Sequence, residues 1–197
     1  CLSIRVADDG AGIEANQVEL AVLRHATSKI AALEDLARVA TRGFRGEALA
    51  SIAAVSRFTL TSRPPHAVAG TRLRAEGGAI VETRSVGCPP GTTVEVEDLF
   101  FNTPARRKFM KSPAAEWART QDALICQALA APHVGFCAIH AGRKAWEAPP
   151  GQTLRNRIAQ LLGTRVADSL LAVEQESDGV AYEGFVSKPG EDRADHR

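Results

Sequence analysis

Leu2-Ser3-Ile4-Arg5-Val6-Ala7-Asp8-Asp9-Gly10-Ala11-Gly12, close to the start of the chain, is where the sequence first indicates its fold class. Apolar and polar residues alternate from Leu2 to Ala7, which is the period of a strand with one buried face. A glycine turn follows over 8–12, and apolar residues recur at helical spacing over 14–29. A strand, a turn and a helix in this order predict an α/β protein. Because the sequence opens with Cys1 rather than Met and enters a strand at once, we expect the chain to begin inside a domain.

Helices and then strands are predicted downstream of this turn. Short helices are expected over 33–40 and 47–55, separated by a glycine-punctuated loop. The period then changes to that of strands, which are predicted over 57–62, 71–75, 79–86 and 93–97. The pair Gly77-Gly78 suits a tight hairpin turn, so antiparallel pairing is the economical arrangement of these strands.

The second half of the chain continues with both kinds of element. Thr103 and Pro104 predict the N-cap and first residue of a helix that runs through residue 110. The longest predicted helix covers 114–130, and its mostly apolar stripe is expected to pack on the sheet: Trp117, Gln121, Leu124, Ile125, Ala128 and Leu129. Later elements are a hairpin of 134–140 and 144–147 around Gly142, a helix over 153–162, and strands over 170–176 and 180–187.

Ala148-Pro149-Pro150-Gly151 predicts a domain boundary, because two prolines and a glycine interrupt both helices and strand ladders. We expect a first domain over 1–148, a linker at 149–152 and the truncated start of a second domain over 153–197. The fold class that we expect is α/β, a two-layer sandwich of helices on a mixed β-sheet, followed by the start of a second α/β domain. The charged stretch 190–197 is expected to be frayed or truncated.

Composition narrows the class of protein. The chain has 197 residues, an apolar fraction of 45% and a net charge of +1, so any basic surface must be local. The four cysteines have no C-x-x-C spacing, which indicates reduced thiols rather than a zinc or redox site. The sequence has no run of about eighteen apolar residues and no secretory leader, so we expect an intracellular protein without a membrane partner.

The turn Asp8-x-Gly10-x-Gly12 is the first candidate for chemistry. It sets a carboxylate at the end of a strand and follows it with glycines that let a flat ligand approach the backbone. A carboxylate only accepts hydrogen bonds, which suits the exocyclic amino group of adenine. A tight turn with an aspartate cap is the alternative explanation of this pattern.

The loop Gly43-Phe44-Arg45-Gly46-Glu47-Ala48-Leu49 is the second candidate. Its glycines flank an arginine just before a helix, whose first N–H groups could hold phosphate oxygens. The same glycines would let the segment fold over a ligand as a lid. A plain helix entry is the alternative.

Arg106-Arg107-Lys108 together with Lys111 is the local basic cluster. It suits contacts with nucleic-acid phosphates, and a solvated helix face is the alternative. Arg155 and Arg157 could extend this surface. Other aromatic and histidine residues are expected to have structural roles, because their spacing fits neither a metal site nor a nucleobase platform: His25, His133, His140, Trp117 and Trp146.

Taken together, these motifs resemble the ATP-binding domain shared by Hsp90, the gyrase B subunit, sensor histidine kinases and MutL. Three segments resemble the MutL-type DNA mismatch-repair family in particular: Ala26-Thr27-Ser28-Lys29, Gly43-Phe44-Arg45-Gly46-Glu47-Ala48-Leu49-Ala50-Ser51-Ile52 and Asn102-Thr103-Pro104-Ala105-Arg106-Arg107-Lys108-Phe109. The resemblance keeps the order of these segments and spans roughly residues 2 to 187. A topoisomerase subunit would not be expected to carry the third segment, and a sensor kinase would need an upstream phosphoacceptor helix.

The resemblance implies a role for each residue of the nucleotide site. Asp8 would bind adenine, Gly10 and Gly12 would make room for it, and Thr27 and Thr92 would support the base and a bound water. The phosphate-facing lid would contain Lys29, Gly43, Phe44, Arg45, Gly46, Glu47 and Leu49, several of them acting through backbone N–H groups. The family pattern usually has asparagine where this sequence has Asp9.

The resemblance also implies what this chain lacks. A helix that precedes the first strand would supply the catalytic glutamate and an asparagine ligand of Mg²⁺, so we expect neither a catalytic base nor a metal ligand here. Glu14 and Glu19 follow the turn and are expected on a solvated face. A lysine that reaches the terminal phosphate would lie beyond Arg197.

The function that the resemblance implies is an ATP-driven switch in DNA mismatch repair. ATP and Mg²⁺ would be its cofactors, and DNA, a MutS-type mismatch-recognition protein and a dimer partner its partners. Residues 153–197 would begin a transducer domain that resembles a ribosomal-protein fold. The protein would be cytoplasmic in a bacterium or nuclear in a eukaryote. A DNA-binding repair scaffold with a degenerate nucleotide site is the alternative.

Overall fold

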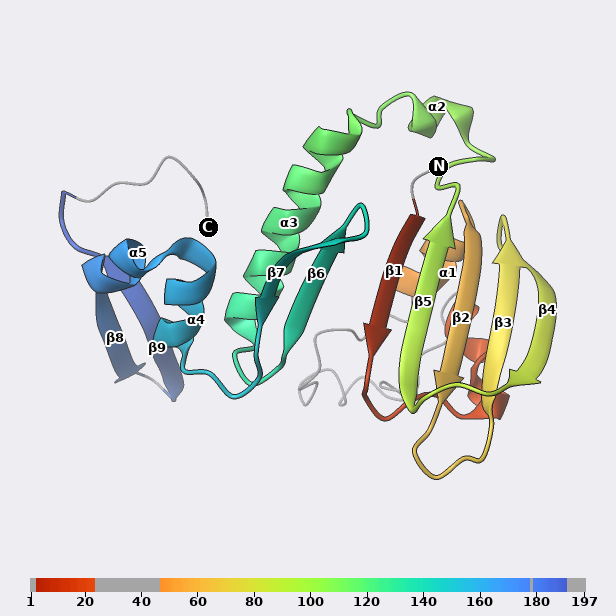
Figure 1. Cartoon of the computed structure of the whole chain (residues 1–197), viewed down its shortest axis with the longest axis horizontal. Helices are drawn as coiled ribbons and strands as arrows, with labels where there is room; N and C mark the ends of the chain where they lie inside the picture. Colours follow the sequence, from red (N-terminus) through yellow and green to blue (C-terminus); the bar gives the residue numbers. More distant parts are fainter. Residues whose placement is uncertain (1–2, 24–46, 178, 191–197) are drawn as a thin grey trace. The chain divides into compact units, whose positions relative to one another are not determined.

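The computed structural model describes residues 3–23, 47–177 and 179–190 (Figure 1). Its contacts divide the chain into two compact units, Cys1–Met110 and Lys111–Arg197. This division comes before the longest helix, whereas the sequence places a linker at 149–152. The domain assignment made from the sequence therefore stays a prediction. No helix within the described ranges is both long and apolar enough to cross a membrane.

The first unit contains a five-stranded sheet in the order β1-β5-β2-β3-β4 (Figure 1). Its strands are those that the sequence predicts, with boundaries shifted by a residue or two: β1 Ser3–Asp8, β2 Arg57–Arg63, β3 Gly70–Glu76, β4 Ala79–Val86 and β5 Gly91–Glu97. Gly77 and Gly78 both have positive φ, +58° and +90°, as a tight hairpin turn between β3 and β4 requires.

The expectation of a mixed sheet is wrong for the described strands, because every neighbouring pair is antiparallel. Two hairpin connections make β2, β3 and β4 antiparallel to one another. The chain then returns, and β5 enters between β2 and β1 in the direction opposite to both. Strand pairs that are distant in sequence therefore decide whether the sheet is mixed or antiparallel, and the periodicity of a single strand does not predict its partner.

The core of this unit lies on one face of the sheet. Phe58, Leu60, Leu73 and Val96 are buried there, together with Ala53 of helix α1, Ala48–Ala53. This helix confirms the one predicted over 47–55. Its alanines are small enough to let the helix approach the strands closely, which is how a second layer forms on the sheet.

The helix predicted over 14–29 is wrong over its described part. Two short 3₁₀ helices stand there, η1 Ala15–Gln17 and η2 Leu20–Val22, and Leu23 is already extended with φ −83° and ψ 144°. Val18, between them, is fully buried in the core. Ala21 and Val22 pack against the same core, so the apolar spacing located the side chains that face the core but not the type of helix. Residues 24–29 and the helix predicted over 33–40 lie outside the described residues.

Helix α2, Pro104–Arg107, is shorter than predicted. Thr103 occupies the N-cap and Pro104 the first helical position, but the Thr103 side chain makes no capping hydrogen bond. The preceding residues are held against the end of α1. The Asn102 amide donates to the Ala54 carbonyl at 2.9 Å, and the Phe100 N–H donates to the Val55 carbonyl at 2.6 Å.

The second unit consists of helices and two hairpins, each pairing only its own strands. Its elements are α3 Pro113–Ala130, β6 Phe136–His140, β7 Arg143–Ala148, α4 Leu154–Leu162, α5 Thr164–Ser169, β8 Leu170–Ser177 and β9 Val180–Ser187. All were expected from the sequence except α5. The predicted stripe of α3 is at least half-buried, with Ile125 and Ala128 innermost, and α3 contacts β6 and α4.

Arg157 joins four segments of this unit and is fully buried. Its guanidinium donates to the carbonyls of Ala128 at 3.1 Å, Pro132 at 2.9 Å, Val134 at 2.8 Å and Pro149 at 2.7 Å. Burial lowers the pKa of Arg157, because desolvation disfavours its charged form. The expectation that Arg157 extends a basic surface is wrong, since its donors are used inside the protein.

Candidate functional site

Asp8 stands at the end of β1, opposite Thr92 of β5. Its Oδ1 accepts hydrogen bonds from the Gly10 N–H at 2.9 Å and from the Thr92 N–H at 3.2 Å. Within the described part of the chain, no group donates to Oδ2, and the residue is exposed. The carboxylate is thus held at one oxygen and open at the other. Such a group can accept a hydrogen bond from a ligand in a defined direction.

The two glycines of the turn have different structural roles. A Cβ at Gly10 would lie 3.0 Å from Asp8 Oδ1, so glycine keeps the space beside the carboxylate open. A Cβ at Gly12, where φ is +70°, would lie 2.4 Å from the Arg63 carbonyl oxygen. Gly12 is therefore required by the close approach of the turn to the end of β2.

Ser62 of β2 holds this turn by hydrogen bonds, and the sequence analysis did not identify it as a site residue. Its hydroxyl is almost fully buried, accepts a hydrogen bond from the Ile13 N–H at 2.8 Å and donates to the Gly91 carbonyl at 3.0 Å. Ile13 follows the turn, and Gly91 precedes Thr92. Because this contact depends on the register of β2 with β5, serine in a strand offered no signal that could have revealed it.

Gly91 is a second residue that the sequence analysis missed. Its φ is +108°, and a Cβ there would lie 2.0 Å from the Asp8 carbonyl oxygen. Only glycine permits β5 to begin this close to the end of β1. The sequence signal was present in Gly91-Thr92-Thr93, where glycine opens a strand, but its partner could not be read from it.

The predicted phosphate-facing residues are described only at the end of their segment. Glu47 is the N-cap of α1, without a side-chain capping bond. The Leu49 side chain packs against the core cluster, so only its backbone N–H could serve a ligand. The remaining predicted residues of this group lie outside the described residues: Thr27, Lys29, Gly43, Phe44, Arg45 and Gly46.

Glu14 and Glu19 are both exposed, as expected from the sequence. Glu14 Oε1 lies 3.2 Å from His66 Nε2, and Glu19 accepts a hydrogen bond from the Thr83 hydroxyl at 2.8 Å. Among the described residues, no three His, Cys, Asp or Glu side chains are grouped to hold a metal ion.

The basic segment of the first unit is exposed and lies on and after α2. Arg106, Arg107 and Lys108 are all exposed, and the Arg106 guanidinium carbon lies 5.4 Å from the centre of the Phe100 ring. Lys111, predicted as part of the same cluster, belongs to the second unit. Arg155 is engaged within that unit, since it donates to the Ala167 carbonyl and stands over the Phe185 ring at 4.8 Å.

Comparison with known proteins places this geometry in a family. No protein-family model matches the chain. The DNA mismatch repair protein MutL of Desulforudis audaxviator is 47% identical over 194 residues, which cover 98% of this chain and 34% of that protein. MutL of Geobacter sulfurreducens is 46% identical over 191 residues, which cover 97% of this chain and 31% of that protein. The chain thus spans about a third of the length of the curated relatives it matches.

Solved structures agree with these relatives. The Aquifex aeolicus MutL ATPase domain complexed with ADP has a TM-score of 0.70 at 33% identity, covering 96% of this chain and 66% of that one. A second structure of the Aquifex aeolicus MutL ATPase domain has a TM-score of 0.68 at 32% identity, covering 95% and 62%. The resemblance inferred from the sequence is confirmed: the chain belongs to the MutL DNA mismatch repair family and corresponds to part of its ATPase domain region.

Proposed function

We propose that this chain contributes the adenine-binding part of an ATP-driven switch in DNA mismatch repair. In the intact protein this switch would couple mismatch recognition to the later steps of repair and would bind DNA. The observation that carries the proposal is the geometry of Asp8, held at Oδ1 by two backbone N–H groups and open at Oδ2.

Adenine fits this carboxylate because its exocyclic amino group is a donor, and an ionised carboxylate is an acceptor only. Gly10 leaves the space beside Asp8 open. The Thr92 hydroxyl, 2.9 Å from Ser62 Oγ, would add a polar contact for the base and a water next to it. The solved MutL ATPase domain with ADP supports this assignment by analogy.

The phosphates of the nucleotide would meet residues 43–49. The first backbone N–H groups of α1 point toward the N-terminal end of the helix, where anions are favoured. We assign this role to the backbone of Glu47 and Leu49, and to the remaining lid residues named from the sequence. Bound ATP would supply the interaction energy that favours a closed state of the protein.

Hydrolysis in the intact protein would need groups that we place outside this chain. We assign the catalytic base and the Mg²⁺ ligand to no residue of this chain, and we therefore expect little or no ATP hydrolysis by residues 1–197 alone. ATP hydrolysis by the purified chain that is reproducible in independent preparations would contradict this assignment.

The wider setting follows from the family. We propose DNA, a MutS-type mismatch-recognition protein and a dimer partner as the partners of the intact protein, inside the cytoplasm of a bacterium or the nucleus of a eukaryote. Residues 153–197 would begin the transducer domain, with a fold similar to that of a ribosomal protein.

Calorimetric titration of the chain with ADP tests the assignment of Asp8. In Asp8→Asn the remaining oxygen can still accept from Gly10 and Thr92, but the second atom becomes an amide donor that faces the amino group of adenine. We expect affinity to fall by roughly 10- to 150-fold, the loss of a hydrogen bond to a charged group.

Asp9→Asn is the matched control, because it removes the same charge one residue away. Its affinity should stay within about twofold of the parent or improve, since a negative charge near an anionic ligand is removed. Equal ADP affinity of Asp8→Asn and the parent would overturn the adenine assignment.

A DNA-binding scaffold with a degenerate nucleotide site is the second candidate. The observation that favours it is Asp9, which stands where the family pattern usually has asparagine and adds a negative charge beside Asp8. This candidate predicts that the parent does not bind ADP while DNA binding persists, and that Asp9→Asn gains ADP binding because the added charge is removed. The switch predicts that the parent binds both.

A further inference from the structure

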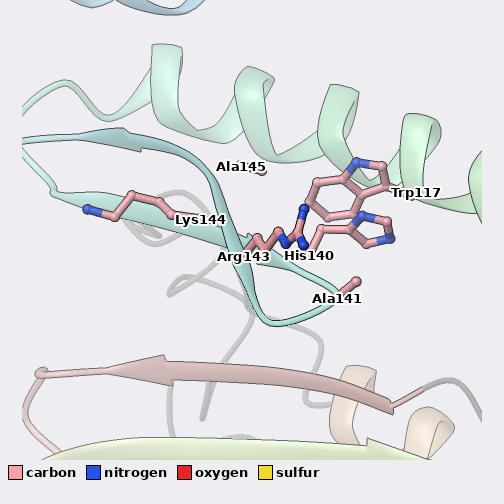
Figure 2. Close-up of a pocket in the computed structure, with 6 residues that line it drawn as sticks. All are labelled: Trp117, His140, Ala141, Arg143, Lys144 and Ala145. Carbon is pink, nitrogen blue, oxygen red and sulfur yellow. The ribbon is translucent and has the colours of Figure 1, made fainter.

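The second unit contains a pocket between the first turns of α3 and the tip of the β6–β7 hairpin (Figure 2). It is largely open to solvent and has a volume of about 460 Å³. Its lining residues are Trp117 from α3 and His140, Ala141, Arg143, Lys144 and Ala145 from the hairpin. All lie within the second unit.

A stacked pair of rings forms one wall of this pocket. The ring centroids of Trp117 and His140 are 4.3 Å apart, and the ring planes differ by 9° (Figure 2). Trp117 is half-buried against the unit, whereas His140 is exposed. Sequence periodicity indicated only packing roles for both. The structure instead stacks an exposed imidazole ring on the half-buried indole, so the ring pair reaches the surface of the unit.

Positive charge lies beside the ring pair. The Arg143 side chain is exposed and points toward the two rings (Figure 2). Lys144 donates to Glu147 at 2.5 Å, and this hydrogen bond and the charge of Glu147 raise the pKa of Lys144. Lys144 is therefore cationic at neutral pH but already paired. Of the six described residues that line the pocket, none is a carboxylate.

We propose that this pocket binds single-stranded DNA, with a base stacked on the Trp117–His140 pair and the adjoining phosphate at Arg143. Aromatic platforms beside arginines bind single strands in this manner, because every base has a flat face and every nucleotide carries a charge. Bases inside a duplex are stacked on each other and cannot reach such a platform. The site lies outside the basic segment of α2 and does not depend on nucleotide binding at Asp8.

Tryptophan fluorescence offers a direct test, because the chain contains only two tryptophans. Trp146→Phe leaves Trp117 as the single reporter. The substitution is mild, since the half-buried Trp146 indole N–H finds no hydrogen-bond partner among the described residues. Titration of this variant with a short oligothymidylate should quench the Trp117 emission. Unchanged emission at concentrations that saturate binding would overturn the stacking.

An abasic strand of the same length separates stacking from charge, because it keeps the phosphates and lacks the bases. The parent chain should bind oligothymidylate more tightly than the abasic strand, by roughly 5- to 150-fold for one stacked base. Trp117→Ala should lose most of this preference, and Trp117→Phe should retain much of it. If Trp117→Ala fails to fold by circular dichroism, His140→Ala replaces it and should reduce the same preference. A variant that folds and keeps the full preference contradicts the proposal.

Arg143→Ala tests the phosphate contact, with Arg119→Ala as the matched control on the exposed surface of α3. Arg143→Ala should weaken binding to both strands several-fold, and Arg119→Ala should change it less than twofold; equal effects would contradict the assignment of Arg143.

A variant of the basic segment, Arg106→Ala with Arg107→Ala, should weaken binding to base-containing and abasic strands alike. If α2 does not bind DNA, the parent still binds oligothymidylate more tightly than the abasic strand. If the Trp117–His140 pair does not stack with a base, this difference is absent.

Discussion

Ser62 Oγ lies 2.9 Å from Thr92 Oγ1, and this contact orders the hydroxyl groups beneath the candidate adenine site. Ser62 has a single hydroxyl proton, which its 3.0 Å contact with the Gly91 carbonyl uses. Thr92 must then donate to Ser62, so the lone pairs of Thr92 remain available as acceptors. Ser62, which the sequence did not indicate, thus sets the hydroxyl orientation of Thr92, which the sequence did.

Ser62→Ala should destabilise the first unit. The substitution leaves the Ile13 N–H without its acceptor, at a cost of about 1–3 kcal/mol. Urea denaturation followed by circular dichroism should show a lower midpoint with an unchanged slope. Affinity for ADP should fall as well, because the turn over 8–13 loses its attachment to β2.

Ser85→Ala is the control for this change, since Ser85 is exposed on β4. Its denaturation midpoint and ADP affinity should match those of the parent. Equal behaviour of the two variants would mean that the Ser62 hydroxyl does not hold the turn.

Gly91→Ala should separate the end of β1 from the start of β5. The new Cβ would lie 2.0 Å from the Asp8 carbonyl oxygen at a φ of +108°, so we expect more than about 1 kcal/mol of destabilisation and loss of ADP binding. Gly87→Ala is the comparison, because a Cβ at Gly87 meets nothing within 4 Å. Thermal unfolding and ADP titration of both variants test this requirement for glycine. A Gly91→Ala variant as stable as the parent that binds ADP would contradict it.

Arg157→Met should destabilise the second unit by at least about 3 kcal/mol, because it leaves one buried and three partly buried carbonyl oxygens without their donors. Arg157→Lys should recover only part of this loss, since an ammonium group cannot reach all four of these carbonyl oxygens at once. Arg165→Met, which removes an exposed arginine on α5, should change little. Urea denaturation followed by tryptophan fluorescence measures all three, and parent-like stability of Arg157→Met would refute the role of Arg157.

The basic segment of α2 should contribute to DNA binding through phosphates. Replacing Arg106 and Arg107 by alanine should lower the slope of log affinity against log salt by about 0.9 for each lost phosphate contact. Arg74→Ala with Arg84→Ala removes the same charge, but both of these arginines are already paired with Glu82, so the slope should stay. Fluorescence anisotropy with a duplex across a range of salt concentrations measures the slope, and equal slopes in the two double variants would remove α2 from the interface.

Local patterns were enough to predict most elements of this protein and its family. The period-2 pattern over 57–62 and 93–97 predicted strands, which the structure confirms as β2 and β5. Gly77-Gly78 predicted a turn, and both residues have positive φ. The glycine turn after Asp8 was likewise predicted from the sequence, whereas its role in adenine binding stays a prediction. The family assignment rested on three motifs, each complete within a short stretch of the chain.

Long-range contacts decided the rest, because their partners are not adjacent in sequence. The insertion of β5 beside β1 made the sheet antiparallel and brought Gly91 against Asp8. Two short 3₁₀ helices stand where the sequence predicted one longer helix, and burial of Arg157 turned an expected surface cation into an internal donor. The Trp117–His140 stack joins α3 to the tip of a hairpin. Because the two residues belong to different elements, no local sequence pattern could predict their contact.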